Sequence, residues 1–171
     1  QYSRYFIGEK FREAFAQGVG LEMARGTFGV AVIADLDNLK QVNDTFGHAA
    51  GDRLLRQCAE LLRSTLRPYD KLYRWGGDEF LLLISSARAG DVIARLSEVL
   101  GRAEPLLITP DGRTVRLAVS LGAADYTSAE NIDESIQLAD AAMYRDKSRR
   151  KSPEMGVRAV NISSAAVRIQ M

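Results

Sequence analysis

The sequence predicts an α/β domain in which helices flank a central, mainly antiparallel sheet. Apolar residues recur at helical spacing in several segments, and runs of apolar and β-branched residues lie between those segments. Two such runs, 72–75 and 80–84, are joined through a glycine pair, which is typical of a β-hairpin with a tight turn. Helices that alternate with a hairpin and further strands favour this architecture over an all-β fold.

Each predicted element follows from its local residue pattern. The run from Thr27 to Ala34 is apolar and β-branched, which is typical of a central strand. The predicted helices are 11–24, 38–44, 49–66, 91–102 and a last long helix marked by Ile132, Ile136, Ala139 and Met143. The predicted strands are 28–35, the two strands of the hairpin, two strands within 106–124 around the turn Pro110-Asp111-Gly112-Arg113, and an edge strand within 157–162.

Composition bounds the class of protein. The 171 residues are 46% hydrophobic and 26% charged, which predicts one globular domain, with its core at about 6–151. A net charge of +1 gives no basis for a nucleic-acid surface. The single cysteine, Cys58, excludes an internal disulfide and falls on an apolar helix face.

The location of the protein is also an expectation from the sequence. No apolar run reaches the length of a membrane span, and no secretory signal is visible. We therefore expect this fragment to make no membrane contact and to be cytoplasmic. Because the chain begins at Gln1, we expect it to be part of a longer protein with an N-terminal sensor, which could itself be anchored in a membrane.

The hairpin carries two acids beside its glycines, in the run Gly76-Gly77-Asp78-Glu79-Phe80. Glycine permits positive φ and lets another group approach the backbone closely. Two carboxylates beside bare backbone suit a metal-bound phosphate. An exposed acidic turn is an equally good interpretation of this run alone.

A second pair of acids, Asp35 and Asp37, ends the strand at 28–35. Strand residues alternate between faces, so both point the same way. If Asp35 meets the hairpin acids, two such charges about 4 Å apart repel by roughly 4 kcal/mol at an effective dielectric constant of 20. Mg²⁺ would convert this cost into binding, because it prefers carboxylate oxygens, water and phosphates. For Asp37, a structural hydrogen bond is at least as good an interpretation.

These residues together resemble a known family. Asp35-Leu36-Asp37-Asn38-Leu39-Lys40, Asn43-Asp44, Gly47-His48, Gly51-Asp52 and the hairpin acids look like a GGDEF domain, the family of diguanylate cyclases, over residues 25 to 150. The resemblance implies a palm-like, ferredoxin-like fold, akin to nucleotide cyclases. It also implies a reaction in which a homodimer joins two GTP molecules into cyclic di-GMP and releases two pyrophosphates.

The resemblance implies a role for each matching residue. Asp78 and Glu79 would be catalytic, and Mg²⁺ or Mn²⁺ would be held by Asp35, the carbonyl of Leu36, Asp78 and Glu79. The implied substrate-binding residues are Lys40 and Lys147 on phosphates, Asn43 and Asp52 on guanine, and Gly76, Gly77 and Lys151.

Guanine chemistry supports one of these roles independently. The N1–H and N2–H₂ donors of guanine match a carboxylate such as Asp52, whereas adenine would leave that carboxylate unpaired. Simpler interpretations are that Asn43 caps a turn and that Asp52 caps the following helix. His48 is the only histidine and is better explained by a structural role than as a general base.

Arg67-Pro68-Tyr69-Asp70 resembles the inhibitory RxxD motif of the family, at the family's distance before the hairpin. Arg67 and Asp70 would then bind the product, cyclic di-GMP, since an arginine fork grips phosphate and an aspartate accepts from guanine. A helix-ending Arg-Pro with an incidental aspartate is the simpler interpretation.

Both ends depart from the family pattern. Residues 1–8 lack most of the usual opening segment, and Arg150 and Lys151 stand where the family has glycine and arginine. The altered opening segment therefore keeps a second function open, a catalytically weak or inactive module that binds cyclic di-GMP or GTP as a sensor. A third possibility is an enzyme that makes a mixed or adenine-containing dinucleotide, which Asp52 disfavours.

Overall fold

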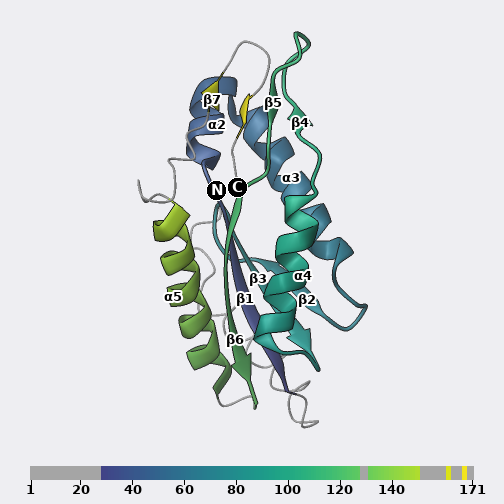
Figure 1. Cartoon of the computed structure of the whole chain (residues 1–171), viewed down its shortest axis with the longest axis vertical. Helices are drawn as coiled ribbons and strands as arrows, with labels where there is room; N and C mark the ends of the chain where they lie inside the picture. Colours follow the sequence, from purple (N-terminus) through teal and green to yellow (C-terminus); the bar gives the residue numbers. More distant parts are fainter. Residues whose placement is uncertain (1–27, 128–130, 151–160, 163–166, 169–171) are drawn as a thin grey trace.

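A four-stranded antiparallel sheet forms the centre of the computed structural model, in the strand order β2-β3-β1-β6 (Figure 1). The structure describes residues 28–127, 131–150, 161–162 and 167–168. The strands of this sheet are β1 (Gly29–Leu36), β2 (Lys71–Arg74), β3 (Glu79–Ser85) and β6 (Val119–Tyr126). Every residue of β1 is buried, because β1 lies between two strands and under helices on both faces.

Helices cover both faces of this sheet. They are α2 (Leu39–Phe46), α3 (His48–Ser64), α4 (Ala89–Gly101) and α5 (Ile132–Arg150). In Figure 1, α5 lies on one side of the sheet and α3 and α4 lie on the other. The two faces follow from strand alternation: Val30 and Val32 pack with the side of α3 and α4, whereas Ala31 and Ile33 pack with the side of α5.

A second, smaller sheet lies apart from the first, with the strand order β4-β5-β8-β7. Its strands are β4 (Leu106–Leu107), β5 (Thr114–Val115), β7 (Asn161–Ile162) and β8 (Val167–Arg168). The predicted turn at 110–113 joins β4 to β5, and Gly112 adopts φ 95°, which glycine tolerates best. The chain then leaves this hairpin and enters β6, so 106–124 contributes to three strands and not two.

Most predicted elements are present, with bounds that differ by a few residues. The predicted helix at 11–24 and the start of the predicted edge strand, 157–160, lie outside the described residues. None of the described helices is both long and apolar enough to span a bilayer.

Candidate functional site

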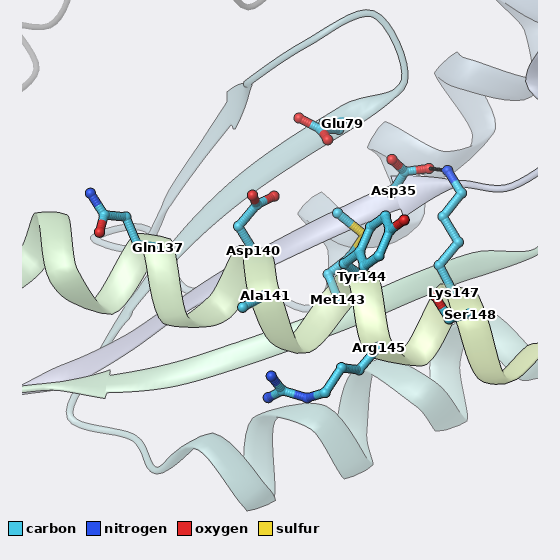
Figure 2. A pocket seen from close by; sticks show the side chains of 10 residues that line it. All are labelled: Asp35, Glu79, Gln137, Asp140, Ala141, Met143, Tyr144, Arg145, Lys147 and Ser148. Atoms are coloured by element: carbon cyan, nitrogen blue, oxygen red, sulfur yellow. Dashed lines mark hydrogen bonds and ion pairs between the residues drawn. The ribbon is translucent and has the colours of Figure 1, made fainter.

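Asp35 and Glu79 lie directly opposite each other on neighbouring strands. The register of β1 and β3 pairs Asp35 with Glu79, as it pairs Ile33 with Leu81 two residues away. Both acids therefore face α5, and Asp35 is only 4% exposed. They line a pocket of about 680 Å³ whose other wall is α5 (Figure 2). The predicted convergence of Asp35 with the hairpin thus occurs in the fold.

Lys147 reaches Asp35 from the last turns of α5. Its Nζ donates to Asp35 Oδ1, which Figure 2 marks as a dashed line, and the two atoms are 2.9 Å apart. Burial raises the pKa of Asp35 to about 6, although the hydrogen bond from Lys147 opposes the shift, and the charge of Asp78 adds to it. Partial burial lowers the pKa of Lys147, but the bond to Asp35 and the surrounding acids outweigh it, so the net shift is upward.

The loop that carries Asp78 differs from the tight turn that the glycine pair predicts. Four residues separate β2 from β3, and the amides of Trp75 and Gly76 both donate to the Glu79 carbonyl, at 2.8 and 3.1 Å. Gly76 and Gly77 do not adopt positive φ. A four-residue loop does not require the left-handed conformations of a two-residue turn, so that reason for the glycines is wrong.

Open space is the property that Gly77 does provide. A Cβ on Gly77 would meet nothing within 4 Å, whereas one on Gly76 would approach Glu79 Oε2 at 3.3 Å. Arg74 stabilises the loop, because its Nη2 and Nε donate to the carbonyls of Gly77 and Gly76 at 2.7 and 3.3 Å. Sequence reasoning missed this contact, although an arginine just before the loop was a signal for it.

Asp37 lies just beyond β1, which ends at Leu36. Its carboxylate accepts from Ser120 Oγ at 2.8 and 3.0 Å, and burial raises its pKa despite that bond. The structure therefore places Asp37 in a structural hydrogen bond, one of its two expected roles. Ser120 was missed, because its partner lies 83 positions away in the sequence.

Asp146 fixes the end of α5 to the sheet. Its Oδ2 accepts from the backbone amide of Leu121 at 3.0 Å and from Arg150 Nε at 3.2 Å. Leu121 lies in β6, which is an edge strand, so this contact occupies a backbone donor that the sheet leaves unpaired. Lys147 follows Asp146 directly and is held near Asp35 by the same anchor. Lys151 lies outside the described residues.

The predicted guanine-binding residues lie on α2 and α3, and neither of them lines the pocket beside Asp35. Asn43 is inside α2, and its Oδ1 is buried against Gly51 with no hydrogen-bond partner among the described residues. Asp52 lines a separate hollow of about 330 Å³. Because α3 begins at His48, Asp52 does not cap it, and that interpretation is wrong.

The interpretation of Asn43 as the cap of a turn is also wrong, because Asn43 lies within helix α2 and not in a turn. Lys40 is exposed in the first turn of α2, and Asn38, the N-cap of that helix, has φ 62°. His48 is exposed at the start of α3.

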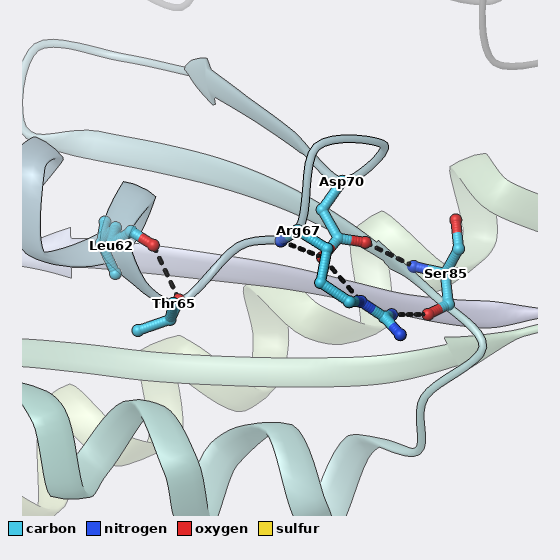
Figure 3. Close-up of polar contacts among 5 residues, drawn as sticks. All are labelled: Leu62, Thr65, Arg67, Asp70 and Ser85. Carbon is cyan, nitrogen blue, oxygen red and sulfur yellow. Dashed lines mark hydrogen bonds and ion pairs between the residues drawn. The ribbon is translucent and has the colours of Figure 1, made fainter.

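Arg67 and Asp70 lie at the other end of β3, beside Ser85 (Figure 3). Asp70 Oδ2 accepts from the backbone amide of Arg67 at 2.9 Å and from its Nε at 3.3 Å, and Oδ1 accepts from the amide of Ser85 at 3.1 Å. The Arg67 Nη2 donates to the carbonyl of Ser85. The side chain of Asp70 is 0% exposed and that of Arg67 is 39% exposed, so only Arg67 faces solvent.

The residues at the Asp35 pocket provide oxygen ligands for a hard divalent cation, but they do not form a complete metal site. Across the described ranges, no three acidic, histidine or cysteine side chains gather closely enough to form a ready-made metal centre. Yet Asp35 is a buried carboxylate with a raised pKa, faces a second carboxylate, and accepts a hydrogen bond from the ammonium group of Lys147. Oxygen donors of this kind are the ligands that Mg²⁺ and Mn²⁺ prefer.

Known proteins resemble this chain in sequence and in fold. The family model described as "Diguanylate cyclase, GGDEF domain" matches residues 3–153. The chain is 33% identical over 125 residues to diguanylate cyclase DosC of Escherichia coli K12, which covers 72% of this chain and 27% of DosC. It is 34% identical over 148 residues to the bifunctional diguanylate cyclase/cyclic di-GMP phosphodiesterase MucR of Pseudomonas aeruginosa, covering 85% of this chain and 21% of MucR. The chain thus spans about a quarter of the length of these relatives.

Solved structures share the fold. Diguanylate cyclase SiaD of Pseudomonas aeruginosa, in complex with its activator SiaC, matches with a TM-score of 0.67 and 32% identity, over 81% of this chain and 55% of SiaD. A sensory box/GGDEF family protein from Caulobacter crescentus matches with a TM-score of 0.62 and 32% identity, over 78% of this chain and 87% of that chain. The expected palm-like fold is thereby confirmed. Because the family model matches nearly the whole chain, the protein belongs to the GGDEF domain family.

Proposed function

We propose that this domain is a diguanylate cyclase, which condenses two GTP molecules into cyclic di-GMP and two pyrophosphates. The observation that carries the proposal is the opposition of Asp35 and Glu79 across β1 and β3, beside a pocket that Lys147 also lines. Two acids and a lysine around one pocket suit phosphoryl transfer, which depends on positioning and on neutralising charge. GTP is a cytoplasmic nucleotide, so the proposed reaction belongs in that compartment.

The carboxylates of Asp35, Asp78 and Glu79 and the carbonyl of Leu36 would hold Mg²⁺ or Mn²⁺. When bound, such a cation supplies positive charge to the triphosphate and makes the ribose 3′-hydroxyl more acidic. Lys147 would exchange its contact with Asp35 for a phosphate oxygen, and Lys40 and Lys151 would bring further positive charge.

The reaction has two bond-forming steps. In each, the 3′-oxygen of one nucleotide bonds to the α-phosphorus of the other, and the bond from that phosphorus to the bridging oxygen breaks. Pyrophosphate leaves with the bonding electrons. Asp78 and Glu79 would assist removal of the hydroxyl proton. Since each chain presents one GTP, two chains would have to face each other as a homodimer.

The base site would use Asn43 and Asp52. The buried Oδ1 of Asn43 supports this role, because an acceptor without a partner costs about 1–3 kcal/mol and a guanine donor would satisfy it. Gly76 and Gly77 would let the nucleotide approach the loop backbone, and Gly77 has open space above it.

Chromatography of products from a GTP and ATP mixture with Mg²⁺ tests this function. We expect cyclic di-GMP as the main product, none with chelator, and a loss of roughly 100-fold or more in Asp78→Ala and Glu79→Ala. Glu60→Ala, on the exposed face of α3, is the matched control and should retain activity. Mixed or adenine-containing products would support the enzyme with a different nucleotide preference, and a folded protein that binds GTP without any product would contradict the proposal.

A binding module remains the second candidate, because Lys147 pairs with Asp35 within the fold and so balances part of the charge of that carboxylate. Calorimetry that detects cyclic di-GMP binding without turnover, lost in Arg67→Ala, would support the module. If the enzyme is instead inhibited by product at Arg67 and Asp70, Arg67→Ala should accumulate more cyclic di-GMP than the unsubstituted protein.

A further inference from the structure

A second hollow, of about 330 Å³, lies between one face of α3 and the hairpin of β2 and β3. The helix contributes positions 52, 55, 56 and 59, which share one face because they are three and four residues apart. The hairpin contributes Arg74 and Phe80. The volume is at the lower end of the range for small-molecule pockets, roughly 300–1,000 Å³.

The charged groups of this hollow differ in what they already bind. The guanidinium of Arg74 donates to the carbonyls of Gly76 and Gly77. The side chains of Asp52 and Arg56 are both exposed, and neither makes a hydrogen bond or ion pair within the described part of the chain. The hollow therefore presents a carboxylate and a guanidinium side by side, one helical turn apart, over an apolar floor of Leu55, Ala59 and Phe80.

This arrangement matches the two polar edges of one base. Guanine presents donors at N1 and N2 next to acceptors at O6 and N7, and arginine binds the O6/N7 pair in a bidentate manner. Adenine presents the N6 amino donor where guanine has O6, so it would set a donor against the guanidinium. The apolar floor suits the ring face, which stacks on apolar and aromatic groups.

We propose that Arg56 is a specificity-determining residue, which binds the O6/N7 edge of the guanine whose N1–H and N2–H₂ face Asp52. This inference rests on the proposed use of guanine nucleotides, and it assigns to Arg56 a contact that sequence reasoning did not identify. The two residues would then read adjacent edges of the base, so each would reject a different analogue.

Calorimetric dissociation constants for three diphosphates test the assignment, because these nucleotides bring the base without the reaction. GDP has both edges, 7-deaza-GDP lacks N7, and IDP lacks the N2 amino group. In the unsubstituted protein, 7-deaza-GDP and IDP should each bind more weakly than GDP, on the order of 10-fold. In Arg56→Ala, GDP should weaken on the order of 10-fold, the difference between GDP and 7-deaza-GDP should vanish, and the IDP penalty should persist.

Two further variants separate base reading from general charge. Arg56→Lys keeps the charge without the bidentate fork and should recover only part of the discrimination. Arg63→Ala removes an exposed arginine from the last turn of the same helix, outside the hollow, and should leave all three constants unchanged. Circular dichroism checks that each variant is folded.

If Arg56→Ala weakens the binding of GDP and of 7-deaza-GDP equally, or weakens neither, the assignment of Arg56 is overturned. The proposed cyclase function would not be affected by that result. Loss of guanine-nucleotide binding and of cyclic di-GMP synthesis in the unsubstituted protein would overturn the proposed function, and this assignment with it.

Discussion

At the scale of single residues, Asp35 links the stability of the fold to the chemistry of the site. It is buried at the end of the central strand, and its charge is opposed by burial and by Asp78 and favoured by Lys147. The sequence located this acid through the strand that precedes it. Lys147, which stabilises the charged form of Asp35, lies 112 positions later in the sequence, on a different element. No local sequence pattern connects the two residues.

The raised pKa of Asp35 predicts a pH-dependent cost to stability. The pKa is about 6 in the fold against 3.8 for the unperturbed group, so the folded state binds more protons between these values, and stability falls as pH rises through them. Above about pH 6 the full cost, roughly 3 kcal/mol, is present. The asparagine of Asp35→Asn cannot ionise, so this variant does not carry that cost. The difference in free energy of unfolding, variant minus unsubstituted protein, should therefore increase by roughly this amount from pH 4 to pH 7.

Urea denaturation without divalent cations across this pH range measures the difference, and contributions from other groups cancel between the two proteins. If the free energies of unfolding of the two proteins change with pH in parallel, the pKa of Asp35 is not raised in the folded state.

Asp70 gives a second prediction at this scale. Its buried carboxylate accepts three hydrogen bonds that hold Arg67 and the end of β3 together. Asp70→Ala leaves two backbone amides without their acceptor and should lower the free energy of unfolding by about 2–4 kcal/mol. Asp70→Asn keeps one carbonyl oxygen and should lose less.

Asp44→Ala, at an exposed site on α2, is the control and should change stability by less than about 0.5 kcal/mol. A fully stable Asp70→Ala protein would mean that this carboxylate is free for a ligand and not committed to the fold.

At the scale of elements, the contact between α5 and β6 positions the site. A Cβ on Gly122 would collide with the carbonyl oxygen of Ala139 and with the backbone of Met143, so the strand and the helix touch there backbone to backbone. The next turns of α5 carry Asp146 and Lys147 to the sheet. Helical spacing predicted α5 from the sequence, but which glycine lets it approach depends on how the helix and strand dock.

Gly122→Ala should therefore separate α5 from β6 and displace Lys147. We expect the free energy of unfolding to fall by about 2–4 kcal/mol, because neither the strand backbone nor the helix backbone can shift without losing hydrogen bonds or packing. We also expect cyclic di-GMP synthesis to be lost. Gly90→Ala is the matched control: its Cβ would meet nothing within 4 Å in α4. It should stabilise the protein by about 0.5 kcal/mol, because alanine restricts the unfolded chain. Similar unfolding midpoints for the two variants would contradict the close approach at Gly122.

At the scale of the whole molecule, the proposed reaction requires two copies of the chain. One pocket of about 680 Å³ beside Asp35 and Glu79 would hold one triphosphate, and the bond to be formed joins two nucleotides. Specific activity should therefore rise with protein concentration, about tenfold for a tenfold increase while monomers predominate, and then level off. Initial rates beside light-scattering masses measure this, and a constant specific activity in a monomeric sample would contradict catalysis by a dimer.

Local sequence patterns predict the α/β class, most of the helices and strands, and the places where acids follow strands, because periodicity and turn chemistry act over a few residues. Contacts across the fold place β1 between β3 and β6 and Asp35 opposite Glu79, bring Lys147 and Ser120 to the two acids, and bury Asp70. Strand register, helix docking and burial depend on contacts between residues far apart in the chain, so no local pattern specifies them.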